Sequence, residues 1–307
     1  MKRFGVPYKG SKNQITEWIY SHFPKADNFY DLFAGGCSIT QIALMKQEFR
    51  HYFCNDIDSD GITLFLDAIH GKFQNENRWI SRADFFKLKN KEPYIKYCWS
   101  FGNNGRDYLY SREKEPYKKA WHYAIYFHDY SLAKDLGLDL TGIEPVKNIH
   151  DRYIALKRII EKSCKENISR CQSLEQLLEL ETLPRLQSQS LHVFSFSFDK
   201  VKILKNSVVY CDIPYVNTDG YENSFDHERF YSWCKKQKEL VLVSEYTMPE
   251  SFICVDEIKK RSLLSADPKG CTSKMEKIFI PKHQLDLYNE MMKLKYLQME
   301  FDFGGVA

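Results

Sequence analysis

The sequence of 307 residues lacks the features that mark several common protein classes. Its nine cysteines form no C-x-x-C pair and no zinc-ligand spacing, which argues against a structural zinc site. It has no apolar run long enough to span a bilayer and no apolar N-terminal signal. We therefore expect a cytoplasmic protein that is neither secreted nor membrane-bound. Cys54, Cys211 and Cys254 lie in apolar, strand-like contexts, which predicts reduced and buried thiols.

The net charge of +3 is too small to indicate a partner by itself, but the charge is unevenly distributed. Between Lys72 and Lys119 there are twelve Lys or Arg residues, six Asp or Glu residues and eleven aromatic residues. Basic residues neutralise phosphates and aromatic rings stack on bases, so this segment predicts a nucleic-acid surface. The alternative is a solvated basic face over a local core.

The segment from Ser207 to Tyr215 has the β-branched and aromatic composition of a buried parallel strand. It ends in Asp212-Ile213-Pro214-Tyr215, and open parallel sheets bind ligands beyond the carboxyl ends of their strands. This sequence suits an amine on a flat heterocycle: Asp212 and the Ile213 carbonyl accept its N–H groups, and the Tyr215 ring stacks on the base. Pro214 stiffens the turn. The alternative is a strand that ends in an ordinary turn.

A second site feature lies near the N-terminus, in Asp31-Leu32-Phe33-Ala34-Gly35-Gly36. Glycines after a strand allow close approach of a ligand to the backbone, and Asp56 ends the next strand, where an acid binds ribose hydroxyls. The third glycine of the dinucleotide fingerprint and the Gly-Lys-Ser/Thr phosphate loop are both missing. A nucleoside with an amino-acid tail and no phosphates remains, which indicates S-adenosylmethionine.

The pattern predicts an α/β protein with a Rossmann-like sheet and a mostly helical insertion. The expected catalytic domain is discontinuous, residues 1–70 and 190–307, and the insertion for target recognition covers residues 71–189. The expected helices are 13–22, 39–49 (capped by Ser38), 151–161, 174–181, 228–238 and 284–293. The expected strands are 29–33, 52–55, 208–211, 240–246, 252–255 and 277–280.

Four motifs together resemble the Dam-type, D12-class DNA adenine N6-methyltransferases. They are Pro7-Tyr8-Lys9-Gly10-Ser11-Lys12, Asp31-Leu32-Phe33-Ala34-Gly35-Gly36, Asn55-Asp56-Ile57-Asp58 and Asp212-Ile213-Pro214-Tyr215. They occur in the order of that family and span most of the chain. The resemblance implies a site-specific enzyme that transfers methyl from S-adenosylmethionine to N6 of a flipped-out adenine in double-stranded DNA. It leaves open the target sequence, a cognate restriction enzyme and the oligomeric state.

The resemblance also assigns roles to individual residues. The catalytic motif is Asp212, Ile213, Pro214 and Tyr215. The expected cofactor-binding residues are Tyr8, Lys12, Asp31, Phe33, Gly35, Asp56, Ile57, Phe196 and Asp212. The segment from Tyr97 to Tyr117 resembles the DNA-contacting hairpin of the family, and the expected DNA-binding residues are Arg106, Arg112, Lys114, Lys118 and Lys119.

The sequence departs from the family at Ile213, where the family most often has proline. The group that acts there is a backbone carbonyl, so isoleucine need not abolish activity. Two alternatives stay open: an amino-methyltransferase for cytosine N4 or RNA, and a DNA-binding protein that has kept the fold but lost turnover. Asp212 favours adenine, because the cytosine enzymes more often have Ser or Asn there.

Overall fold

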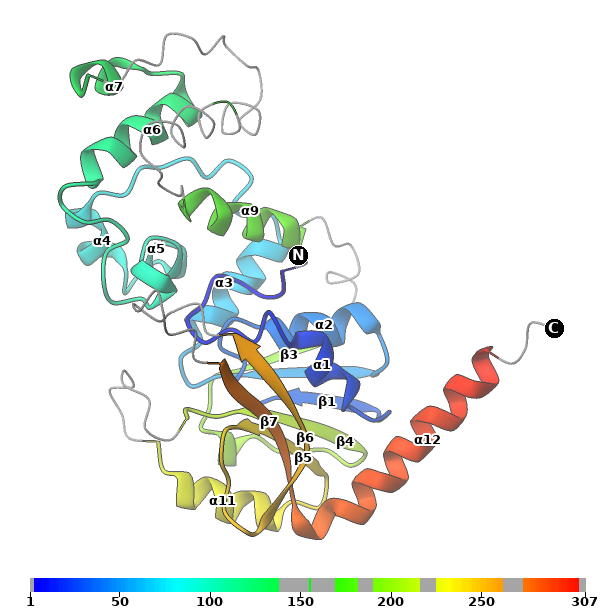
Figure 1. Ribbon diagram of the computed structural model, residues 1–307. Coiled ribbons are helices and arrows are strands. Elements are labelled where there is room, and N and C mark those ends of the chain that lie inside the picture. The colour runs from blue at the N-terminus through cyan, green and yellow to red at the C-terminus, as the bar shows by residue number, and fades with distance from the viewer. Residues whose placement is uncertain are drawn as a thin grey trace. The chain divides into compact units, whose positions relative to one another are not determined.

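The computed structural model describes residues 3–137, 155, 169–181, 190–215, 225–261 and 273–303 (Figure 1). The chain divides into two compact units. The first, here called the sheet unit, comprises residues 1–6, 10–66 and 183–307. The second, the helical unit, comprises residues 67–182 together with Pro7–Lys9. The short N-terminal segment of the helical unit has no counterpart in the two-part division that the sequence predicts.

The sheet unit is built on a seven-stranded sheet with the order β3-β2-β1-β4-β5-β7-β6. The strands are β1 (Asn28–Asp31), β2 (His51–Asn55), β3 (Leu191–Phe194), β4 (Ser207–Asp212), β5 (Leu240–Glu245), β6 (Phe252–Arg261) and β7 (Ser273–Pro281). Strands β1 to β5 are parallel, and β7 is antiparallel to both β5 and β6. The predicted α/β sheet is confirmed. The strand order reverses between β1 and β4, and ligands bind at the carboxyl ends of strands at such a reversal.

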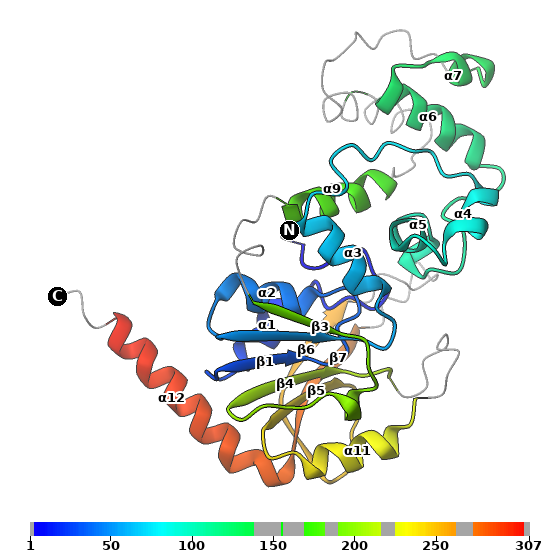
Figure 2. The ribbon, with the colours of Figure 1, turned by 180° about the vertical axis from the view of Figure 1, so that it is seen from behind.

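The central strands carry apolar side chains on both faces of the sheet, so helices cover both faces. In β4, Val209 and Cys211 pack in a core with Phe230 and Cys234 of α11 (His227–Lys236). Tyr210 points to the opposite face, where its ring lies 5.6 Å from that of Phe23. That face carries α1 (Thr16–Ser21) and α2 (Ser38–Lys46), and Figures 1 and 2 show α11 across the sheet from them.

Strand β3 was not predicted from the sequence. It lies at the edge of the sheet, and its four residues are exposed or only half-buried, so it has no buried apolar run to mark it. At the other edge, β6 and β7 form a longer hairpin than expected, followed by α12 (Leu285–Phe303). Cys254, on the outer strand β6, is exposed, so the prediction of a buried thiol was wrong there, whereas Cys54 and Cys211 are buried.

The turn from β1 to α2 differs from the expected geometry. Ser38, the expected cap, is instead the first residue of α2. The N-cap of this helix is Cys37, which has left-handed backbone angles (φ 61°) and makes no side-chain capping bond. The N-terminal segment closes over this turn, where Val6 N–H donates to the Gly36 carbonyl (2.8 Å). Gly5 has a φ of +70°, and a Cβ there would lie 2.2 Å from the Gly36 oxygen, so only glycine fits.

The helical unit has its own core. Its described helices are the C-terminal part of α3 (Asp60–Ile69), α4 (Arg82–Leu88), α5 (Pro93–Cys98), η1 (Phe101–Asn103), α6 (Glu115–Phe127), α7 (Ser131–Asp135) and α9 (Ser169–Glu181). One small cluster of α6 and α7 contains Trp121, Ala124, Ile125 and Ala133. The predicted helix 174–181 lies within α9, whereas the predicted helix 151–161 falls outside the described residues except for Ala155.

Across the described ranges, none of the helices combines the length and the apolar composition that a membrane span requires.

Candidate active site

The carboxyl ends of the central strands bring the predicted acidic residues together. Asp31 ends β1, Asp212 ends β4, and Asp56 directly follows β2. Strands β1, β2 and β4 are neighbours in the sheet, so these three carboxylates lie at one edge, at the reversal of strand order. The field of each acts on the others: Asp212 contributes to raising the pKa of both Asp31 and Asp56.

Lys12 is the cation of the site. Its Nζ lies 2.8 Å from Asp212 Oδ1 and 3.0 Å from Glu276 Oε1, and it also donates to the Tyr215 hydroxyl. Burial favours the neutral form of Lys12, but Asp212 and Glu276 outweigh this effect, so the pKa of Lys12 lies above its ordinary value. Lys12 is therefore a buried ammonium held between two carboxylates. Glu276, on β7, was not identified from the sequence.

Tyr215 is fixed by both ends of its side chain. Its hydroxyl accepts from Lys12 and donates to Glu276, and its ring meets that of Tyr246 edge-on at 4.5 Å. Burial, followed by the charges of Asp212 and Glu276, raises the Tyr215 pKa well above its ordinary value, so the hydroxyl keeps its proton. Tyr246 directly follows β5, the neighbour of β4 in the sheet. Its position after a strand end could have identified it as a site residue, but the sequence analysis did not include it.

The middle of the catalytic motif is held by packing. The Ile213 side chain is buried in the core between the sheet and α11. The Pro214 carbonyl accepts a hydrogen bond from His227 Nε2 (2.9 Å), at the start of α11. The backbone of the turn is therefore tied to a helix as well as stiffened by proline.

Asp31 is almost fully buried at the end of β1. Its Oδ2 accepts from the backbone N–H (3.1 Å) and the hydroxyl (2.7 Å) of Thr40 in α2. Its Oδ1 is buried without a hydrogen-bond partner among the described residues. Burial raises the pKa of Asp31 to about 7, against which the bonds from Thr40 act. Asp31 thus braces the first turns of α2 and keeps one acceptor unused.

Asp56 shapes the glycine turn. Its Oδ2 accepts from Gly35 N–H (2.8 Å) and its Oδ1 from Asp58 N–H (2.9 Å). Burial raises the pKa of Asp56 to about 6, and these two backbone bonds oppose the rise. Each oxygen of a carboxylate has a second lone pair, so Asp56 can accept from a ligand while it holds the turn.

Two apolar side chains beside Asp56 are exposed. Ile57 is 77% exposed and Phe196 is 53% exposed, and Ser195 Oγ donates to the Ile57 carbonyl (3.3 Å). Asn55 fixes the Phe196 backbone by accepting from its N–H and donating to its carbonyl, both at 3.0 Å. The sequence did not single out the Asn55 side chain, which forms this link between the end of β2 and Phe196.

Phe33 and Tyr8, two predicted cofactor-binding residues, pack against other aromatic rings. Phe33 is half-buried and packs among Phe198, Phe225 and Phe230, with ring centroids 5.7–5.8 Å away. Tyr8 belongs to the helical unit, where its ring lies 5.0 Å from that of Tyr97.

The predicted DNA-contacting segment forms a tight turn in the helical unit. Ser100 and Tyr108 form an antiparallel bridge, and Phe101 N–H donates to the Asp107 carbonyl (2.8 Å). Phe101 is exposed at this turn. Arg106, in the turn, and Arg112 and Lys114, which follow it, have exposed side chains.

Lys118 departs from the expectation of a solvent-facing phosphate contact. Its side chain is buried, with Nζ 4.6 Å from the Trp121 ring centroid and 6.0 Å from that of Tyr110. Lys119, one position further along α6, is half-buried, with Nζ 5.6 Å from the Tyr123 ring. Helix periodicity separates the two neighbours: one faces the core and the other the surface.

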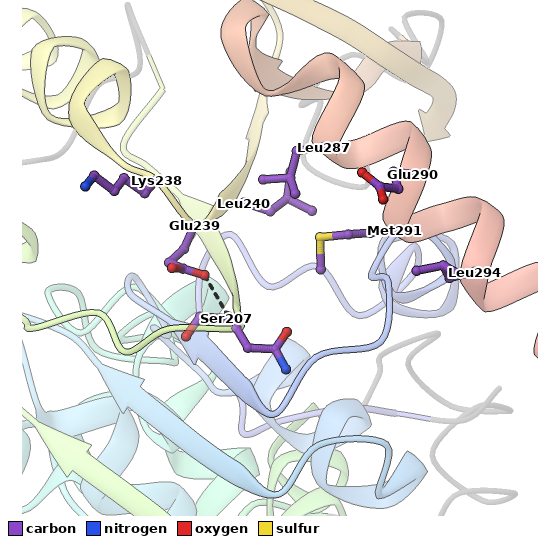
Figure 3. A pocket seen from close by; sticks show the side chains of 9 residues that line it. Ser207, Lys238, Glu239, Leu240, Leu287, Glu290, Met291 and Leu294 are labelled. Atoms are coloured by element: carbon purple, nitrogen blue, oxygen red, sulfur yellow. Dashed lines mark hydrogen bonds between the residues drawn. The ribbon is translucent and has the colours of Figure 1, made fainter.

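A pocket in the sheet unit lies away from these groups (Figure 3). Ser207 and Leu240 begin β4 and β5, so the pocket is at the amino ends of the strands, whereas the acidic residues are at the carboxyl ends. Leu287, Met291 and Leu294 of α12 form its apolar side. The pocket is therefore distinct from the candidate active site.

One comparison with known proteins identifies a family. The family model described as D12 class N6 adenine-specific DNA methyltransferase matches residues 8–246. The matched segment includes Lys12, the glycine turn, Asp56 and the motif from Asp212 to Tyr215, and it ends at Tyr246. Glu276 lies beyond it.

We predict that Asp31→Asn stabilises the ligand-free protein at pH 8. The folded-state pKa of about 7 lies above the ordinary value of 3.8, so Asp31 makes the fold less stable as pH rises between these values. Asparagine can still accept from Thr40 but carries no buried charge. Thermal unfolding should show a midpoint roughly 2–4 °C above that of the parent at pH 8, and a smaller difference at pH 5. An equal difference at both pH values would contradict this.

Proposed function

The chain belongs to the D12 class N6 adenine-specific DNA methyltransferase family and is an enzyme that methylates adenine N6 in DNA; on this premise we propose how it does so. S-adenosylmethionine is the methyl donor, and Asp212, Ile213, Pro214 and Tyr215 bind the target adenine. The observation that carries the proposal is the Asp212 carboxylate, which ends β4 at the reversal of strand order beside Lys12 and Tyr215.

The residues at the strand ends suit each part of S-adenosylmethionine. Asp56 accepts from the ribose hydroxyls, and the exposed side chains of Ile57 and Phe196 enclose the adenine ring. Asp31 Oδ1, which has no hydrogen-bond partner in the described part of the chain, accepts from the ammonium of the amino-acid tail, and Gly35 allows the close approach of this group. Bound cations lower the pKa of a buried carboxyl, so Asp31 releases its proton as the ligand binds.

The catalytic motif acts on a poor nucleophile, because the N6 lone pair of adenine is delocalised into the ring. Asp212 and the Ile213 carbonyl accept the two N6–H bonds, which orients the amine and stabilises the positive charge that develops on it. The Tyr215 ring, held by Tyr246 and by its own hydroxyl, forms a rigid surface for the base.

When bound, S-adenosylmethionine supplies an electrophilic methyl group on a sulfonium: the N6 lone pair forms the C–N bond while the C–S pair stays on sulfur. The methylated N6 is then cationic and loses one proton. Of the two groups that accept the N6–H bonds, Asp212 is the base. It takes this proton and later releases it to solvent. Positioning of the amine contributes much of the rate.

The substrate is double-stranded DNA, from which the target adenine is flipped out, because N6 is inaccessible inside the stacked duplex. The exposed cations of the helical unit bind phosphates, which supply most contacts in protein–DNA complexes. We further propose a cytoplasmic location, where the free thiols of the described cysteines stay reduced. A cognate restriction enzyme would act on the same sequence in unmethylated form.

We predict that the purified protein transfers labelled methyl from S-adenosylmethionine to duplex DNA, with N6-methyladenine as the product. The product is identified by mass after digestion to nucleosides. Asp212→Ala should lower the transfer rate on the order of a hundredfold or more, because it removes the charged acceptor for the amine. N4-methylcytosine as the product, methylation of RNA instead of DNA, or an inactive parent protein would refute the proposal.

We predict that Asp56→Ala weakens the binding of S-adenosylmethionine by roughly tenfold to a hundredfold, from the loss of hydrogen bonds to a charged acceptor. Calorimetric titration measures the affinity. Asp58→Ala is the matched control, because Asp58 is exposed and its Oδ1 accepts from Asp60 N–H in the same turn. Equal affinities for the parent protein and Asp56→Ala would remove Asp56 from the site.

We predict that changing Arg106, Arg112 and Lys119 together to Ala weakens DNA binding regardless of sequence. The slope of log affinity against log salt should become shallower by nearly one unit for each phosphate that the variant no longer neutralises. Lys236→Ala, an exposed lysine on α11 of the sheet unit, is the control. An unchanged slope in the triple variant would show that these side chains do not bind phosphates.

A further inference from the structure

Glu276 is a buried carboxylate in the active site that stability alone does not explain. It lies on β7 with 0% of its side chain exposed. Its Oε1 interacts with Lys12 (3.0 Å) and accepts from the Tyr215 hydroxyl. Its Oε2 is buried and has no hydrogen-bond partner within the described ranges. An unpaired polar atom in the interior is costly, and apolar residues often replace buried ion pairs without loss of stability.

The two carboxylates that hold Lys12 differ in access. The Asp212 side chain keeps 22% of its surface exposed, whereas that of Glu276 keeps none. An incoming amine can therefore reach Asp212 but not Glu276. Glu276 therefore acts on the reaction without touching the amine, through the side chains of Lys12 and Tyr215 that it contacts and through its charge.

The charges of the cluster show what Glu276 adds. Lys12 and Asp212 alone would form a neutral pair, so the ammonium would compete with the adenine amine for Asp212. With Glu276, the three side chains sum to one negative charge, and Lys12 has a second charged partner. The surplus negative charge also attracts the positive charge that develops on N6, and this attraction stabilises the transition state.

Transfer of the proton from N6 to Asp212 also requires a second charged partner for Lys12. When Asp212 takes the proton from N6, it becomes neutral and no longer balances Lys12. A buried ammonium that loses its only charged partner is strongly destabilised. Glu276 keeps Lys12 paired through this change, and the cluster passes from one negative charge to zero.

We propose that Glu276 is a positioning residue for methyl transfer, which holds the Lys12 ammonium so that Asp212 can bind the adenine amine and accept its proton. The inference rests on the proposed function of Asp212. It adds a residue outside the segment that the family model matches.

The first test is Glu276→Gln, which keeps the shape of the side chain and removes its charge. We expect the single-turnover rate at saturating S-adenosylmethionine to fall on the order of tenfold to a hundredfold, with cofactor affinity changed less than about threefold. The matched control is Glu245→Gln: Glu245 is equally buried, but it accepts from Tyr246 N–H. Its rate should stay within about threefold of the parent.

The second test removes the ammonium that Glu276 holds. In Lys12→Met/Glu276→Gln, Asp212 carries the only charge of the cluster, so the cluster has one negative charge as in the parent, and no ammonium competes for Asp212. This double variant should transfer methyl faster than Glu276→Gln alone, an increase that a merely structural role of Glu276 does not produce. Because it removes an opposite pair, it also serves if Glu276→Gln does not fold; its rate should then stay within about a hundredfold of the parent, a limit that allows for the loss of Lys12 itself from the site.

The parent protein is measured first, with labelled S-adenosylmethionine and duplex DNA. A parent that forms no N6-methyladenine refutes the proposed function. An active parent with Glu276→Gln within about threefold of its rate overturns the role of Glu276 alone. So does a double variant no faster than Glu276→Gln or, where that variant is unfolded, one slowed by more than about a hundredfold.

Discussion

The buried ion cluster around Lys12 is the interaction on which the candidate active site depends. It joins three parts of the sheet unit that are far apart in sequence: Lys12 before α1, Asp212 at the end of β4, and Glu276 on β7. One ammonium has three hydrogens to donate, and here they reach two carboxylates and the Tyr215 hydroxyl. The N-terminal segment and the β6–β7 hairpin are thus held at the end of β4 by charge as well as by packing.

The carboxylates that lie together at one edge of the sheet destabilise the folded protein when no ligand is bound. Asp31 is buried and Asp56 is half-buried, and their raised pKa values show that the ionised forms are disfavoured before a ligand arrives. A ligand that carries positive charge relieves this cost, so the same residues that destabilise the free protein favour binding. Such a conflict between stability and function is expected at an active site.

The sequence was sufficient for the parts of the site that depend on local pattern. Alternating strands and helices, glycines after β1 and the motif after β4 locate Asp31, Gly35 and Asp212 at strand ends. Glu276 could not be found in this way, because nothing in β7 alone shows that it lies against Lys12 more than 260 positions away. The burial of Lys118 was missed for a related reason: its place on α6 depends on which face of the helix is covered. The edge strand β3 lacks the apolar run that marks the central strands.

Exposed aromatic side chains need a different kind of support from buried ones. Phe196 has more than half of its surface in solvent, so packing cannot fix its position strongly. Asn55 instead binds the backbone of Phe196 through both its N–H and its carbonyl, and it bonds the Leu32 carbonyl (3.0 Å) as well. Because Asn55 is itself buried, these bonds are shielded from competing water. The backbone that carries the exposed ring is therefore fixed beside Asp56, and the ring itself stacks on that of Phe194, with centroids 5.9 Å apart.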